Sequence, residues 1–153
     1  MLTAIVKNNY YCLIFMKKKV LFVCTHNSAR SQIAEGLLNY FFGDRYQAFS
    51  AGSAPTKVNP FSIEVLNEMG IDATNHYSKN MLEFKDFKFD YVITVCDNAK
   101  ETCPFFPGAK EYIHKSFKDP SSTEGSYEDK LNAFRKTREE IKDWVIEFFC
   151  KNK

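Results

Sequence analysis

The chain has 153 residues, of which 44% are hydrophobic and 26% charged, and its formal net charge at pH 7 is +2. This length suits one domain with a core of its own, and the composition is that of a globular protein. A nucleic-acid-binding protein normally carries a clustered basic face, which a charge so near zero does not favour. We therefore expect a single globular domain that does not bind nucleic acid.

The chain holds five cysteines in an irregular pattern: Cys12, Cys24, Cys96, Cys103 and Cys150. Small secreted domains stapled by disulfides usually carry an even and denser set. The cysteine content therefore predicts reduced thiols and a cytoplasmic protein.

The first 15 residues are expected to form an extension without a catalytic role, which leaves Cys12 outside the chemistry. Their one apolar block, 10–16, is too short to span a bilayer. Three lysines follow it where a signal peptide would carry a small-residue cleavage site. We therefore predict an extension over 1–15, one domain over 16–153 and no membrane segment.

Apolar runs and helical periodicity alternate along the rest of the chain. In chain order we predict a strand at 20–23, a helix from about 31 to 43, a strand at 47–51, a helix at 60–70, a strand at 91–95, a weaker strand at 111–114 and a helix from 127 to 148. Asn59 followed by Pro60 is a typical helix start, and Ser126 with Asp129 resembles a capping box. Strands that alternate with helices predict an α/β fold, a four-stranded parallel sheet with helices on both faces.

The segment between the first strand and the first helix carries the most specific pattern. Cys24 ends the strand, and Arg30 follows six residues later where the helix begins. Such a loop can wrap its N–H groups around a tetrahedral anion, with Arg30 binding two of the oxygens. The same field stabilises a thiolate at Cys24. The predicted oxyanion loop consists of Thr25, His26, Asn27, Ser28, Ala29, Arg30 and Ser31.

Two side chains of this loop have further predicted tasks. Ser31 can donate a hydrogen bond to the Cys24 thiolate, and Asn27 can pin the loop through bonds to the backbone. A buried structural cysteine before a capping loop would look similar. The strand before, the helix after and the serine beside Arg30 favour a nucleophile.

From about residue 18 to 146 the sequence resembles the low-molecular-weight protein tyrosine phosphatase superfamily, and most closely its thioredoxin-coupled arsenate reductase branch. Besides the loop, the segments 50–52 and 59–60 match landmarks of that family in the right order. The resemblance implies a phosphatase-like three-layer fold and no cofactor. It further implies that Cys24 attacks arsenate, with phosphate or sulfate as competing anions.

The resemblance also implies a general acid. The family places an aspartate before a proline near the pocket, and Asp119 before Pro120 fits that pattern. Asp119 would protonate the oxygen that leaves the arsenic as Cys24 attacks. Without the resemblance, Asp-Pro is only a turn signal.

Cys96 and Cys103 distinguish a reductase from a phosphatase. Cys96 follows the third strand, and the segment up to Cys103 resembles the redox segment of thioredoxin-coupled arsenate reductases. The resemblance implies that Cys96 attacks the Cys24–arsenic adduct, forming a Cys24–Cys96 disulfide and releasing arsenite. Cys103 then forms a Cys96–Cys103 disulfide, which thioredoxin reduces.

The spacing of this pair has a structural consequence. Seven residues of helix rise about 10 Å, whereas a disulfide tolerates Cα separations only to about 7 Å. If residues 99–102 are helical in the reduced protein, that turn must unwind before Cys96 and Cys103 can pair. We therefore expect a redox-driven change from helix to loop over 97–103.

We predict no metal site. A zinc site usually contains a closer pair of cysteines, and His76 and His114 are not spaced to complete one. Two buried structural thiols remain an alternative for Cys96 and Cys103, and Cys150 is expected to be a bystander.

Some relatives hold a potassium ion near the anion loop. Asn27, Glu35 and Ser50 match positions that could supply oxygens to it. Lys79 stands where an aspartate of that site would be, and its ammonium could take the cation's place.

Three functions remain open on the sequence. The favoured one is arsenate reduction. A low-molecular-weight protein tyrosine phosphatase could also use Cys24, Arg30 and Asp119. However, phosphatases typically carry tyrosines where Ser121 and Ser122 stand. A non-catalytic oxyanion or redox sensor is the third.

Overall fold

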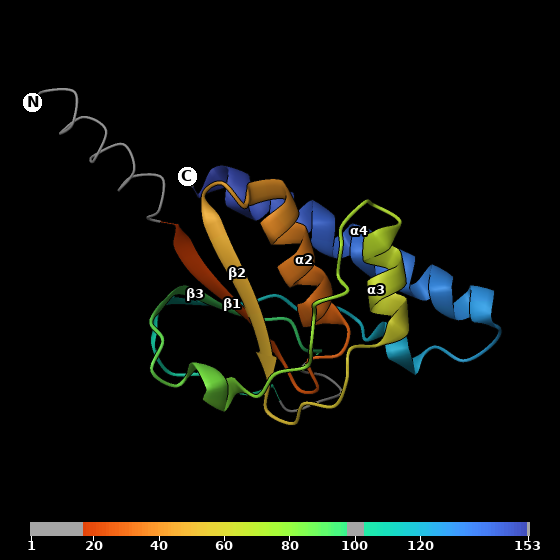
Figure 1. The fold of residues 1–153 in the computed structure, drawn as a ribbon, viewed down its shortest axis with the longest axis horizontal. Coiled ribbons are helices and arrows are strands. Elements are labelled where there is room, and N and C mark those ends of the chain that lie inside the picture. Colours follow the sequence, from red (N-terminus) through yellow and green to blue (C-terminus); the bar gives the residue numbers. More distant parts are fainter. Residues whose placement is uncertain (1–16, 98–102, 153) are drawn as a thin grey trace, which may run out of the picture.

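The computed structural model describes residues 17–97 and 103–152 (Figure 1). The extension predicted over 1–15 lies outside the described residues. So does 98–102, and with it most of the segment for which a helix-to-loop change is predicted.

A four-stranded parallel sheet lies at the centre of the molecule, as predicted. Its strands are β1 (Lys18–Cys24), β2 (Tyr46–Gly52), β3 (Phe89–Thr94) and β4 (Ala109–His114), in the order β2-β1-β3-β4. β1 is an inner strand, and its last five residues are all buried. Its continuous apolar run is therefore explained, because both faces of the strand are covered.

The carboxyl ends of the strands meet at one edge of the sheet. Cys24 at the end of β1 pairs with Gly52 at the end of β2. On the other side of β1, Val23 pairs with Thr94, which ends β3. Parallel α/β sheets bind ligands at this edge.

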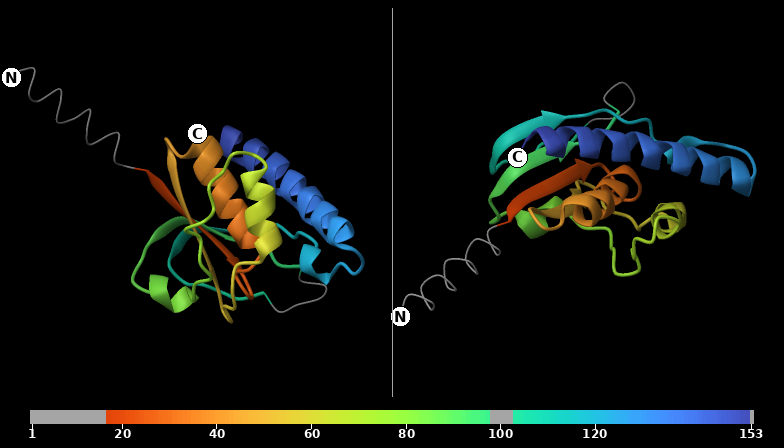
Figure 2. Two further views of the ribbon diagram at one scale, coloured as in Figure 1. Left: turned by 45° about the vertical axis from the view of Figure 1, so that its right-hand side comes forward. Right: turned by 90° about the horizontal axis from the view of Figure 1, so that it is seen from above.

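Three α-helices cover one face: α2 (Arg30–Phe42), α3 (Pro60–Asn67) and α4 (Tyr127–Lys151) (Figures 1 and 2). α2 packs on β1 and β2, and α3 packs against α2 and α4. Phe149 of α4 reaches the sheet, with its ring centroid 4.8 Å from that of Tyr46. The half-buried Trp144 stacks on Phe148 and packs against this core, as predicted.

The other face is covered by the short 3₁₀ helix η1 (Met81–Phe84) and by aromatic side chains. Leu21 and Val23 of β1 point to this face and pack with Phe84 and Phe106. The predicted α/β fold with both faces covered is confirmed.

Local signals explain where two helices begin and end. Ser126 and Asp129 form the predicted capping box of α4, with the Ser126 Oγ 3.1 Å from the Asp129 N and the Ser126 N 3.0 Å from the Asp129 Oδ2. α3 begins at Pro60 as predicted but ends at Asn67 rather than Gly70. The chain turns there, because Ile71 N donates to Leu66 O and Gly70 takes a φ of 77°.

Within residues 17–97 and 103–152, none of the helices is long and apolar enough to cross a membrane.

Candidate active site

The loop between β1 and α2 turns its carbonyl groups outward. Each carbonyl from Thr25 to Ala29 accepts a hydrogen bond from a group outside that stretch. The donors are Ala54 N for Thr25 O, Ser78 Oγ and Thr56 N for His26 O, Gln32 Nε2 for Asn27 O, Asn59 N and Ser62 Oγ for Ser28 O, and Ile33 N for Ala29 O. With the carbonyls fixed on the outside, the peptide N–H groups can face the interior of the loop, as anion binding requires.

The N-terminus of α2 adds to this anion-binding geometry. Ala29 is the N-cap residue and has no side-chain oxygen to accept from the first turn of the helix. Helix starts usually have such an acceptor, because their first N–H groups lack partners within the helix. An anion in the loop can supply it, and the helix dipole favours its negative charge.

Asn27 holds the loop in shape. It is fully buried and takes a left-handed φ of 49°, which asparagine tolerates better than most residues. Its Oδ1 accepts from Gln32 Nε2 at 2.8 Å and from Lys79 N at 2.9 Å, and its Nδ2 donates to Ser31 Oγ at 2.8 Å. The side chain therefore ties the loop to α2 and to the segment before η1.

Ser31 connects this network to Cys24. Its Oγ lies 2.9 Å from the Cys24 Sγ and accepts the hydrogen bond of Asn27. Because that oxygen already accepts from Asn27, its own hydrogen is available to Cys24. Ser31 can thus donate to a thiolate at Cys24, the arrangement predicted for this pair.

Arg30 and Asp119 lie beside each other on one side of the pocket. Arg30 is 4% exposed, and its guanidinium donates from Nη1 to Phe117 O at 3.1 Å and places Nη2 3.7 Å from the Asp119 Oδ2. Asp119 caps the short 3₁₀ helix η2 (Pro120–Ser122), with Oδ1 accepting from the backbone N and the Oγ of Ser121. One carboxylate oxygen thus holds the turn, and the other lies beside Arg30.

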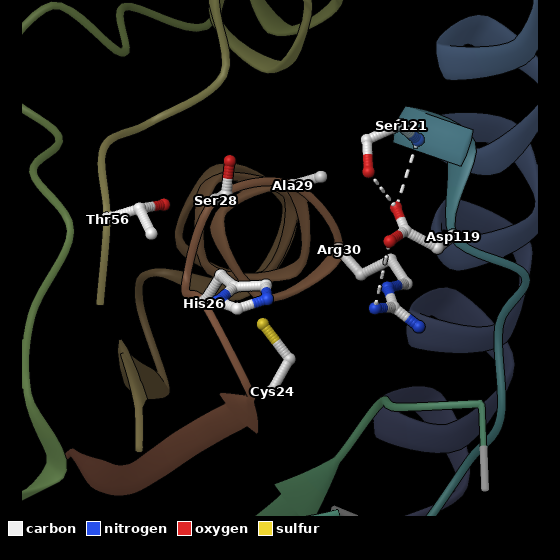
Figure 3. A pocket seen from close by; sticks show the side chains of 8 residues that line it. All are labelled: Cys24, His26, Ser28, Ala29, Arg30, Thr56, Asp119 and Ser121. Carbon is white, nitrogen blue, oxygen red and sulfur yellow. Dashed lines mark hydrogen bonds and ion pairs between the residues drawn. The ribbon is translucent and has the colours of Figure 1, made fainter. Parts of the chain in front are cut away.

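These groups enclose a pocket of about 130 Å³ (Figure 3). Its described lining consists of Cys24, His26, Ser28, Ala29, Arg30, Thr56, Asp119 and Ser121. The pocket contains a nucleophile, a fixed cation and a carboxyl group, and its lining is small or polar. This arrangement can bind a tetrahedral oxyanion and attack its central atom.

Two further thiols, Cys96 and Cys103, pack in the same core cluster as Cys24. Cys96 follows β3, is fully buried and has its Sγ 3.9 Å from Val23 O, the residue before Cys24. Cys103 is half-buried and packs against the same core cluster as Cys24 and Cys96. Cys150 lies apart from these thiols, exposed near the end of α4.

A buried ion pair lies behind the loop. Lys79 Nζ lies 3.7 Å from Glu35 Oε1 and donates to Tyr77 O at 2.9 Å. Burial raises the pKa of Glu35, and the Lys79 ammonium acts in the opposite direction. His76 Nδ1 lies 3.4 Å from the other Glu35 oxygen, and burial together with the Lys79 charge lowers the pKa of His76. Lys79 thus brings its ammonium to Glu35, one of the positions matched to the potassium site of some relatives.

The described residues contain no group of three or more His, Cys, Asp or Glu side chains placed to hold a metal ion.

Some residues of the site are not apparent from the sequence. Thr56 reaches the pocket from a loop whose course no local pattern reveals, and Ser121 reaches it from η2. Gln32, fully buried, binds Asn27, Tyr77 O and His76. A glutamine at a buried position of an apolar helix is the one signal that could have pointed to this network, since buried polar groups need partners.

Comparisons with known proteins agree with the geometry. The model of the family named low molecular weight phosphotyrosine protein phosphatase matches residues 19–152. A protein of Halalkalibacterium halodurans named arsenate reductase is 40% identical over 125 residues, covering 82% of this chain and 90% of its own.

Two solved structures are similar over most of the chain. One, described as an arsenate reductase in the phosphate binding state, has a TM-score of 0.73 at 28% identity and covers 88% of this chain and 98% of its own. The other, a thioredoxin-dependent arsenate reductase of Corynebacterium glutamicum, has a TM-score of 0.68 at 28% identity. The match covers 97% of this chain and 71% of that one. The chain is therefore an enzyme that belongs to the low molecular weight phosphotyrosine protein phosphatase family.

Proposed function

We propose that the enzyme reduces arsenate to arsenite by a relay of three thiols, Cys24, Cys96 and Cys103. The observation that carries the proposal is the second buried thiol, Cys96, at the end of the strand beside that of Cys24. Hydrolysis of a phosphate ester needs one nucleophilic cysteine. Reduction needs further thiols, because two electrons must be supplied to the arsenic.

The first step forms a covalent adduct in the pocket. The Cys24 thiolate attacks arsenic, so that a sulfur–arsenic bond forms and an arsenic–oxygen bond breaks. Arg30 binds oxygens of the anion, and Ser31 orients the sulfur. Asp119, as the carboxylic acid, gives its proton to the departing oxygen, which leaves as water.

The second step moves electrons to arsenic. The Cys96 thiolate attacks the Cys24 sulfur, forming a Cys24–Cys96 disulfide while the electron pair of the sulfur–arsenic bond stays on arsenic, which leaves as arsenite. Cys103 then attacks Cys96, so that Cys24 is released as a thiolate and a Cys96–Cys103 disulfide forms. A dithiol of the thioredoxin class reduces that disulfide. The thioredoxin-dependent relative supports this choice of reductant.

A tyrosine phosphatase is the alternative. It would use Cys24, Arg30 and Asp119 in the same pocket and would release the phosphoryl group to water. It gives no role to Cys96 or Cys103. Arsenate and phosphate are both tetrahedral anions, so weak hydrolysis of aryl phosphates is compatible with the reductase.

A coupled assay with arsenate, thioredoxin, thioredoxin reductase and NADPH tests the relay in Cys96→Ser and Cys103→Ser variants. We expect both to lose multiple turnover, since neither can return Cys24 to a thiolate. Cys150→Ser is the matched control and keeps full turnover, because Cys150 is exposed and far along α4 from the pocket. Full turnover in both relay variants would show that the relay is wrong.

A further inference from the structure

The side chain of His26 lines the pocket, although its place in the oxyanion loop requires only its backbone. Figure 3 shows its ring beside the Cys24 sulfur, on the side away from Arg30 and Asp119. A group at this position can reach an anion from the direction opposite to the guanidinium.

The orientation of the ring is fixed by the loop 52–56. His26 Nδ1 lies 3.1 Å from Ala54 O, and the His26 backbone carbonyl accepts from Ser78 Oγ at 2.8 Å and from Thr56 N at 3.3 Å. A carbonyl oxygen can only accept, so Nδ1 must carry the hydrogen of this bond. No described residue hydrogen-bonds to Nε2, so Nε2 is left for the pocket.

This tautomer makes the ring sensitive to protonation. A neutral His26 with its hydrogen on Nδ1 presents a lone pair at Nε2, which an anion does not attract. A protonated ring presents an N–H and a positive charge there instead. An oxyanion in the pocket therefore favours the protonated ring.

We propose that His26 is an oxyanion-binding residue whose imidazolium donates from Nε2 to an oxygen of the bound anion, so that binding takes up a proton at His26. The proposal rests on the oxyanion pocket of the proposed function and adds a second cation, opposite Arg30. Reaction of the ring with substrate is not required.

Other charged or titratable side chains lie near the His26 ring, on the elements that surround the pocket. Cys24 ends β1, Arg30 begins α2 and Asp119 caps η2. Lys79 follows Ser78, but its ammonium points to Glu35 and Tyr77 O. Cys24 and Asp119 can also alter anion affinity with pH, so the test must observe His26 itself.

Proton NMR of the intact enzyme makes that observation. The chain has only three histidines, and sulfate is the probe because it keeps its charge between about pH 5.5 and 8, where imidazole titrates. By linkage, an anion that binds the protonated ring better raises the titration midpoint of His26, by one pH unit for each tenfold difference in affinity. We expect saturating sulfate to raise that midpoint by about one pH unit, which corresponds to tenfold tighter binding.

His114 is the internal control. It is exposed on β4, bonds to Thr94 Oγ1 at 2.7 Å and lines a different pocket. Its midpoint stays constant when sulfate is added.

A matched variant separates charge from support of the loop. His26→Asn places an amide where Nδ1 stands, so it can keep the bond to Ala54 O while it removes Nε2. Lowering the pH from 8 to 5.5 should raise the sulfate affinity of both proteins. We expect this rise to be about tenfold larger in the wild type than in the variant. If the variant does not fold, the NMR titration of the unaltered protein still decides.

The outcomes separate this proposal from the proposed function. Bound sulfate with an unchanged His26 midpoint, or equal pH profiles in the two proteins, overturns the role of His26 and leaves the pocket intact. Absence of any sulfate binding overturns both.

Discussion

One carboxylate oxygen of Asp119 caps η2 and the other lies beside Arg30, and a substitution can separate this cap from the proposed role as acid. Asp119→Asn keeps an oxygen to accept from Ser121 N but cannot give up a proton. We expect arsenate turnover to fall by about a hundredfold or more, the usual contribution of a general acid, with little change in melting temperature. Asp129→Asn, at the start of α4, is the control and keeps its activity. Unchanged turnover in Asp119→Asn would exclude Asp119 as the acid.

Lys79 compensates a buried carboxyl group. Lys79→Met leaves Glu35 without its cation, and breaking a buried pair in this way costs about 3–5 kcal/mol of unfolding free energy near neutral pH. The loss should shrink on acidification. Burial raises the pKa of Glu35 in the folded protein. The free energy cost of the charged carboxylate is therefore complete above this raised pKa, and it vanishes below the pKa of the unfolded chain, about 4.3, where Glu35 is protonated in both states.

Urea unfolding of Lys79→Met at several pH values measures this dependence. Adding Glu35→Gln should restore much of the lost free energy at neutral pH, because no buried charge remains. A loss that does not vary with pH and is not rescued by Glu35→Gln would contradict the pairing.

At the scale of elements, Gly52 lets the end of β2 approach the anion loop. A Cβ at this position would stand 2.4 Å from Thr25 O and 3.0 Å from both Asn27 N and Cys24 O. These are backbone atoms, so Gly52→Ala must displace the loop. We expect sulfate binding and turnover to fall by about tenfold or more and the melting temperature to drop by several degrees. Ser53→Ala, the exposed neighbour, should change neither.

Elements with strong local signals are the ones that sequence predicts well. β1 follows from its apolar run, and α4 begins where Ser126 and Asp129 form a capping box. The end of α3 is missed by three residues, because the turn after Asn67 depends on a bond from Ile71 N to Leu66 O.

At the scale of the whole molecule, predictability depends on whether a residue acts through its neighbours in sequence. Cys24, Arg30 and Ser31 belong to one continuous loop, so their pattern is visible in the chain and the structure brings them together. Thr56 and Ser121 come from distant segments, as do His76 and Tyr77, which bind Gln32, and only the fold places them at the loop. The predicted change over 97–103 concerns a segment most of which lies outside the described residues, so it stays a prediction.

The central claim is that three thiols pass two electrons to arsenate. The most direct test is one turnover without an external reductant, followed by disulfide mapping and arsenite quantification in wild type and Cys103→Ser. We predict one arsenite per protein in each, with a Cys96–Cys103 disulfide in the wild type and a trapped Cys24–Cys96 disulfide in the variant. Arsenite formation that leaves Cys96 as a free thiol in both proteins would contradict the account.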